Sequence, residues 1–302
     1  MLPSIHIFRN PHPGIAILLV FFTSLGTGII NFFRGVHLFD EDIDFWIAPI
    51  CIGLASWLIN VILVYRSRYL LSNYLLGWYW WCLLIALTDD PLTWKEGVLS
   101  VGISIWMAIL FELGDERKKS LRTRSNLGFT AALLGLVQPL LLTLLIPSII
   151  SLAVGLKVIA RDCLQVIIAW LMPIISYIAF LMLPFISLNP FIFNIQPNVS
   201  FRWPLFGEYI VLIWAFFALS QTLRALTNAK KPKRRGLLIS WLGIGYAILL
   251  SFFSPNSSEY IPILAVFFGP HLVNLQNYIY PKKLQYWLTP SFLLAALVEI
   301  II

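Results

Sequence analysis

Charged side chains are scarce in this sequence. They make up 12% of the 302 residues, whereas 59% of the residues are hydrophobic. Soluble domains carry about a quarter charged residues, so this composition excludes an ordinary soluble fold. There is also no long polar segment in which a separate soluble domain could form. The composition therefore predicts one integral membrane domain over residues 1–302.

Cysteine and nucleotide-binding motifs are also lacking. The three cysteines, Cys51, Cys82 and Cys163, lie in apolar stretches without CxxC spacing, which excludes a cysteine-based metal site. There is no GxSxG, Walker or GxGxxG pattern. The net charge of +7 does not indicate nucleic-acid binding, because the basic residues form short runs between apolar stretches. The partner that this pattern predicts is a lipid bilayer, whose anionic headgroups balance the charge.

Long apolar runs dominate what is present. A bilayer-spanning helix needs about 20 apolar residues. Nine runs suit a single helix each, and the residue ranges are 14–33, 45–64, 70–87, 97–113, 163–183, 206–224, 237–253, 261–279 and 287–302. The third run contains the aromatic sequence WYWW at 78–81, which is typical of an aromatic belt at a membrane interface.

The stretch 127–156 is harder to assign. It has no charged residue and is too long for one straight span but too short for two ordinary spans. Pro139 and Pro147 interrupt it, and proline breaks or kinks a helix. Two short helices meeting at Gln138 and Pro139 are one solution, and one kinked helix is the other.

Lysine and arginine residues decide between these solutions, because cytoplasmic loops are enriched in them. If the stretch crosses twice, 18 of the 21 basic residues lie inside and only Arg34, Lys95 and Arg202 lie outside. If it crosses once, 9 lie inside and 12 outside, so the bias is lost. We therefore predict an all-α, polytopic transmembrane helical bundle of about 11 spans in the cell inner (cytoplasmic) membrane. Its N-terminus is inside and its C-terminus outside, and the pair at 127–156 either crosses fully or is re-entrant.

Carboxylates gather on the predicted outer side. Asp40, Glu41, Asp42 and Asp44 follow the first run, and the pair Asp89–Asp90 follows the third. Clustered carboxylates repel one another, which should raise the pKa of at least one of them. A carboxylate with a raised pKa could act as a general base. The same oxygens could instead hold a hard divalent cation, or the sequence could simply be a solvated acidic loop.

Two histidine positions are further candidates. His37 precedes the acidic cluster and is a candidate for an outer site through that proximity. His271 and Asn274 are polar residues within an apolar run, where polar groups are costly and often functional. Packing of a kinked helix against its neighbours explains them equally well.

The order of these features in residues 1–185 resembles a known membrane module. A first helix, an outer acidic loop, two helices, a second acidic pair and a basic inner loop are followed by the sequence SNLGFTAALLGLVQP at 125–139. This layout is similar to that of the polyprenyl-phosphate-sugar-dependent glycosyltransferases of the GT-C superfamily, with residues 186–302 adding C-terminal helices. The chain also resembles a small family of uncharacterised Bacteroidota membrane proteins, through its FRNPHPG start at 8–14 and the glycine-rich helix running into Pro139.

The GT-C resemblance implies an envelope glycosyltransferase, or a reduced relative of one, that uses a polyprenyl-phosphate-linked sugar. One carboxylate of the first outer loop would deprotonate an acceptor hydroxyl, and the catalytic candidates are Asp40, Glu41 and Asp42. A cation would stabilise the leaving phosphate. The candidates for substrate binding are Arg34, His37, Lys95 and Arg202; a divalent cation held by Asp40, Asp42, Asp89 and Asp90 is the alternative.

Two other functions fit the same sequence, so the residues alone leave open whether the chain is an enzyme. A non-catalytic membrane subunit of an envelope assembly or secretion complex agrees with the small loops and would bind other membrane subunits. A transporter or lipid-handling protein agrees with the kinked helices and with His271, and it predicts a continuous polar cavity.

Overall fold

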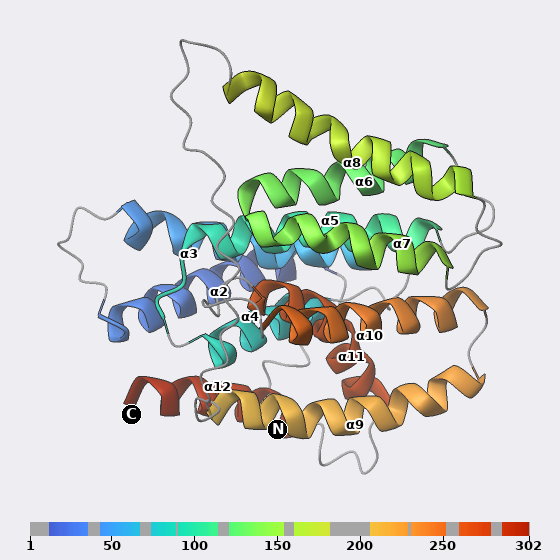
Figure 1. Cartoon of the computed structure of the whole chain (residues 1–302). Helices are drawn as coiled ribbons and strands as arrows, with labels where there is room; N and C mark the ends of the chain where they lie inside the picture. The colour runs from blue at the N-terminus through green and yellow to red at the C-terminus, as the bar shows by residue number, and fades with distance from the viewer. Residues whose placement is uncertain are drawn as a thin grey trace.

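The computed structural model describes residues 12–35, 43–66, 74–88, 90–113, 121–153, 160–181, 206–228, 231–251, 260–278 and 286–301. Within these ranges the regular structure is entirely helical (Figure 1). The α-helices are α2 (Pro13–Phe33), α3 (Ile43–Asn60), α4 (Leu75–Leu87), α5 (Trp94–Leu113), α6 (Leu121–Val137), α7 (Leu145–Ala153), α8 (Ala160–Leu181), α9 (Phe206–Asn228), α10 (Lys231–Ser251), α11 (Ile261–Tyr278) and α12 (Leu288–Ile301). A π-helical turn, η1 (Val61–Arg66), ends α3, and a 3-10 helix, η3 (Pro139–Leu144), precedes α7. The predicted all-α bundle is confirmed.

The helices have the length and composition of an integral membrane protein. In the part of the chain that the structure describes, five are long and apolar enough to cross a bilayer, namely Pro13–Phe33, Trp46–Val64, Trp94–Leu113, Ala160–Leu181 and Phe206–Leu223. Further apolar helices of 10 to 17 residues pack among them. Many large apolar side chains are exposed on their outer faces, which is the arrangement that lipid tails stabilise.

Successive helices run back and forth across the bundle. In Figure 1, α3 begins and α8 and α12 end on the left, whereas α9 ends and α10 begins on the right. The basic residues at the start of α10, and Arg161 in the first turn of α8, therefore lie toward the right-hand end. This is the end that the distribution of lysine and arginine predicts to be cytoplasmic.

The stretch 127–156 reverses direction at Gln138. Gln138 has extended backbone angles, φ −133° and ψ 106°, and Pro139 then begins η3. A Cβ atom on Gly135 would lie 2.9 Å from the backbone nitrogen of Leu142, so the chain folds back onto α6. Two short helices meeting at Gln138 and Pro139 are thus the observed solution. The return limb of η3 and α7 is about 25 Å long, most of the ~30 Å apolar thickness of a bilayer.

The short helix α4 forms the centre of the bundle. Every one of its 13 residues is buried, and it packs against α2, α3, α9, α11 and α12. A helix that is apolar on all sides suits either a protein core or lipid, and the burial of α4 shows that it lies in the core. The expected aromatic belt at 78–81 is therefore wrong, because Trp78, Tyr79, Trp80 and Trp81 lie inside the protein.

Glycines allow the neighbouring helices to approach α4 closely. A Cβ on Gly77 would lie 2.3 Å from the carbonyl oxygen of Ser56 in α3. A Cβ on Gly207, in the first turn of α9, would lie 1.5 Å from the carbonyl oxygen of Ala86. Both distances are far below contact, so only glycine permits these backbone approaches. The first approach holds the N-terminal end of α4 against α3, and the second places its C-terminal end at the level where α9 begins.

Candidate functional site at the ends of α2 and α4

The predicted outer-site residues are only partly within the described structure. Arg34, Asp90 and Lys95 are described, and both Asp90 and Lys95 are exposed. The others lie outside the described residues, and they are Asp40, Glu41, Asp42, His37, Asp89 and Arg202. The geometry of the site is therefore that of the helix ends to which the two acidic sequences are attached.

Arg34 directly follows α2 and binds the end of α4. Its Nη1 donates to the carbonyl oxygen of Asp90 at 3.0 Å, and its Nη2 donates to the carbonyl oxygens of Ile85 at 3.0 Å and of Thr88. The last carbonyls of a helix have no intrahelical donors and carry partial negative charge. A guanidinium group satisfies both needs, so Arg34 caps α4 from a different helix. Its predicted role in substrate binding stays a prediction.

Asn31, one turn before Arg34, makes a second connection. Its Nδ2 donates to the carbonyl oxygen of Leu92, and the Leu92 amide donates back to its Oδ1, both at 2.8 Å. The side chain is only 1% exposed, so water cannot replace these bonds. This reciprocal pair fixes the segment between α4 and α5 against the last turn of α2.

A third connection lies deeper in the bundle. The indole Nε1 of Trp81 donates to Thr27 Oγ1 at 3.0 Å. A Cβ on Gly26 would lie 2.4 Å from the Trp81 ring, so the indole packs directly on the α2 backbone. Thr27, Asn31 and Arg34 are spaced by four and three residues and thus share one face of α2. That face holds α4 and the chain that follows it.

The start of α5 is fixed by a capping box. Thr93 is followed three residues later by Glu96, whose carboxylate accepts hydrogen bonds from the Thr93 amide at 2.9 Å and from the Thr93 hydroxyl. This is the S/T-x-x-E signature of a helix N-terminus. It places the start of α5 at Trp94, three residues before the predicted run at 97–113. Glu96 is 6% exposed, so its carboxylate serves the cap rather than the outer surface.

These contacts join the attachment points of the two acidic sequences. Residues 36–42 connect α2 to α3, and these two helices pack along each other. Residue 89 lies between Thr88 and Asp90, whose carbonyls both accept from Arg34. The first and third apolar runs, α2 and α4, are therefore neighbours in the structure. Sequence analysis missed Asn31, although an asparagine near the end of an apolar run is a recognisable signal.

A metal site has no support from the described residues, which contain no group of three or more histidine, cysteine, aspartate or glutamate side chains able to hold a metal ion. Three of the four predicted metal ligands, Asp40, Asp42 and Asp89, are not among them. The predicted divalent cation stays a prediction.

His271 lies in the interior, between α9, α10 and α11. It is 2% exposed, its Nδ1 lies 3.3 Å from Thr222 Oγ1, and its ring centroid lies 4.8 Å from that of Trp241. Asn274, one turn further along α11, is partly buried. Ring packing and one hydroxyl contact surround His271, in line with the packing interpretation, whereas its buried Nε2 has no hydrogen-bond partner in the described structure.

Comparisons of the chain with protein-family models, with curated proteins and with solved structures found no match. The function is therefore inferred from the residues and their geometry.

Proposed function

We propose that this integral membrane protein transfers a sugar from a lipid carrier to an acceptor hydroxyl at the non-cytoplasmic surface. The observation that carries the proposal is the joining of the two acidic sequences at their attachment points by Arg34 and Asn31. A catalytic carboxylate and a second acidic pair act together only if their helices are held in a fixed relation. The bonds from α2 to the α4–α5 connection supply such a relation.

The chemistry needs one base and one stabilised leaving group. The carboxylate of Asp40, Glu41 or Asp42 removes the acceptor's hydroxyl proton as its oxygen bonds to the sugar C1. The bond between C1 and the carrier's phosphate oxygen breaks, and the lipid phosphate leaves with the electron pair. A cation stabilises the charge on that phosphate. The Nη1 and Nη2 donors of Arg34 bind carbonyls, so the exposed Lys95 is the better candidate for this task.

The interior of the bundle counts against the transporter hypothesis. That hypothesis predicts a continuous polar cavity between helices. The middle of the bundle is instead occupied by α4, whose 13 residues are all buried and include Trp80 and Tyr79, each 0% exposed. Close packing of such large aromatic side chains leaves little room for a polar cavity beside α4 itself.

Deletion of the gene in the native host tests the proposed reaction. We expect the lipid-linked sugar donor to accumulate and one envelope glycan to lose a sugar residue, because the proposed transfer consumes the donor and adds its sugar to that glycan. Mass spectrometry of extracted lipids and of released glycans measures both changes, and expression of the wild-type chain should reverse them. Unchanged donor and glycan pools would contradict the proposal. A stoichiometric partner recovered in mild detergent, with unchanged pools, would indicate the non-catalytic subunit instead.

A further inference from the structure

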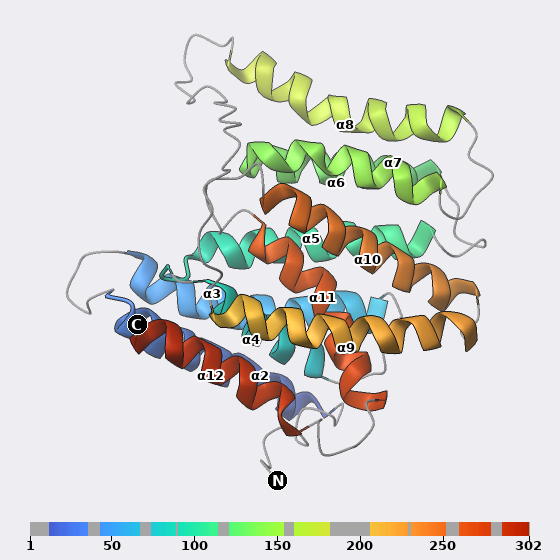
Figure 2. The ribbon, with the colours of Figure 1, turned by 60° about the horizontal axis from the view of Figure 1, so that its bottom comes forward.

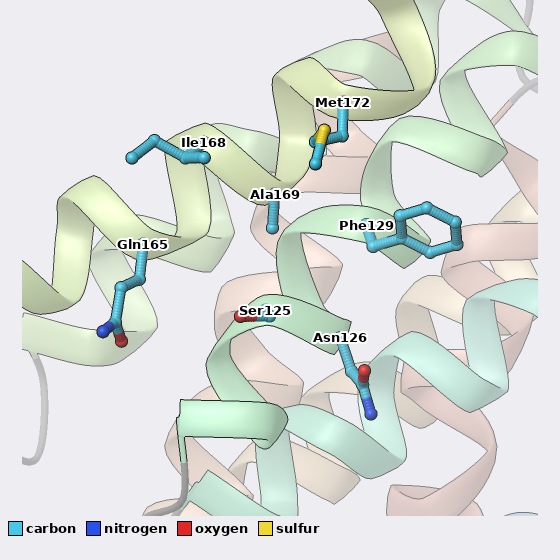
Figure 3. Close-up of a pocket in the computed structure, with 7 residues that line it drawn as sticks. All are labelled: Ser125, Asn126, Phe129, Gln165, Ile168, Ala169 and Met172. Carbon is cyan, nitrogen blue, oxygen red and sulfur yellow. The ribbon is translucent and has the colours of Figure 1, made fainter. Parts of the chain in front are cut away.

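A groove follows the contact between α6 and α8. Its inner part has a volume of about 500 Å³ and is lined by residues of both helices, among them Ser125, Asn126, Gln165 and Ala169 (Figure 3). Its outer part has a volume of about 480 Å³ and includes Leu133, Leu136 and Phe180. Phe129 and Met172 line both parts, so the two parts are adjacent along the contact between the helices.

The groove arises from the way in which the two helices cross. A Cβ on Gly128 would lie 2.1 Å from the carbonyl oxygen of Val166, so the backbones of α6 and α8 nearly touch at this point. Figures 1 and 2 show α8 diverging from α6 toward its own C-terminal end. Two rigid helices that touch at one point and then diverge leave a wedge between them. Large side chains such as Phe129 line the wedge without filling it.

The groove faces the bilayer. α8 lies at the edge of the bundle in both views, and only 11% of its most apolar window is buried. From Gln165 to Phe180 the two parts of the groove extend over sixteen residues of α8, or about 22 Å. This exceeds the ~15 Å depth of one leaflet's hydrocarbon. The shape and lining therefore suit a long hydrocarbon chain.

The side-chain amides of the groove lie at its inner end, whereas its outer part carries the hydroxyl groups of Ser176 and Tyr177. Ser125 and Asn126 come from the first turns of α6, and Gln165 comes from the second turn of α8 (Figure 3). The Gln165 Oε1 atom is buried and has no hydrogen-bond partner in the described structure. A buried acceptor without a donor is costly, so a hydroxyl group of a bound molecule would be stabilising there.

Two arginines lie beyond this polar end. Arg122 precedes Asn126 by four residues, and Arg161 precedes Gln165 by four. Each arginine therefore shares a helix face with a groove residue, and it lies one turn closer than that residue to the end predicted to be cytoplasmic. Both arginines are exposed. Arg124 is instead bonded to Asp162 across the two helices, which balances that pair of charges. The groove thus has a mainly apolar lining and a positively charged end, which is predicted to lie at the level of the inner headgroups.

We propose that this groove binds one anionic, hydroxyl-bearing lipid of the inner leaflet. The hydrocarbon chain lies along Phe129, Leu133 and Met172, the phosphate lies toward Arg122 and Arg161, and a headgroup hydroxyl donates to Gln165 Oε1. The site is independent of the proposed sugar transfer, which takes place at the opposite end of the bundle.

Blocking the groove tests the chain-binding part. Ala169→Trp places an indole in the inner part, and Ala179→Trp places the same group on an exposed position of α8 that does not line the groove. The full chain, purified in mild detergent, is mixed with equal amounts of phosphatidylglycerol and phosphatidylcholine of matched chain length, and native mass spectrometry measures bound lipid. We expect A169W to lose the bound lipid and A179W to retain it. Equal retention by both variants would overturn the proposal.

Removing the two arginines tests the headgroup part without altering the core. The double variant R122Q/R161Q should keep a bound lipid but lose at least about fivefold in preference for phosphatidylglycerol, because one basic residue at an anionic surface contributes about that factor. The control R234Q removes an exposed arginine in α10, away from the groove, and should keep the wild-type preference. A wild-type chain without headgroup preference, or cross-linked dimers in which a second copy covers α8, would also overturn the proposal.

Discussion

Replacing Asp40, Glu41 and Asp42 together by Asn, Gln and Asn is expected to reduce sugar transfer roughly 100-fold to 10,000-fold, the contribution of a positioned general base. The amides keep the size of the side chains but cannot accept a proton from the acceptor hydroxyl. Because the substitutions keep side-chain size in the segment that joins α2 to α3, stability should change by less than about 0.5 kcal/mol. Donor accumulation in the deletion host, complemented with the variant, measures the loss.

A matched control lies in a connection that is predicted to be on the opposite side of the membrane. Asp115→Asn with Glu116→Gln also neutralises adjacent carboxylates, but in the basic connection between α5 and α6 that is predicted to be cytoplasmic. This variant should complement fully. If the triple variant also restored the glycan to the wild-type level, the carboxylates would have no catalytic role, and the proposed reaction would have to be abandoned.

Replacing Arg34 by Ala is expected to lower the free energy of unfolding by about 3 kcal/mol. Hydrogen bonds to charged groups contribute about 1.5 to 3 kcal/mol, and removing a donor leaves its acceptors unsatisfied. Here the carbonyls of Ile85, Thr88 and Asp90 would lose their donor at once. Arg34→Lys keeps the charge but not the planar fork of donors, so its loss should be smaller. Thermal unfolding in mild detergent measures both variants.

Lys95→Ala is the control for Arg34, because it removes an exposed cation near the same end of the bundle. It should change stability by less than about 0.5 kcal/mol. Hydrogen exchange adds a local measurement. In R34A the amides of residues 85–92 should exchange faster, whereas those in the middle of α5 should not. If R34A unfolded at the same temperature as the wild-type protein, the contacts of Arg34 would not be what holds α4 in place.

Much of the fold could be predicted from the sequence, because apolar run length and charge sorting report directly on helices in a membrane. The reversal at Gln138 is an example: Pro139 interrupts the run, and the positive-inside distribution requires an even number of crossings there. The placement of α4 could not be predicted in the same way. Lipid and the protein interior are equally apolar, so the sequence does not distinguish a helix in lipid from a helix in the core. The aromatic pattern therefore predicts Trp80 and Trp81 at the membrane interface, although they lie at the centre of the bundle.

The candidate site was predictable in its residue types but not in its connections. The acidic sequences are evident from charge alone. The partners of Arg34 are not, because backbone carbonyls are present at every residue and leave no mark in a sequence. Asn31 has the same limitation, since both of its bonds go to the backbone of Leu92. Only the three-dimensional arrangement shows that one face of α2 holds the whole α4–α5 connection.

The central claim is that both acidic sequences lie on the non-cytoplasmic surface, and cysteine labelling in intact cells tests it most directly. In a background in which Cys51, Cys82 and Cys163 are replaced by Ala, single cysteines are placed at Asp40 and Asp90, and at Arg122 and Arg161 as inner controls. A membrane-impermeant maleimide should label positions 40 and 90 in intact cells, and positions 122 and 161 only after permeabilisation. Labelling of 40 or 90 only after permeabilisation would contradict the account.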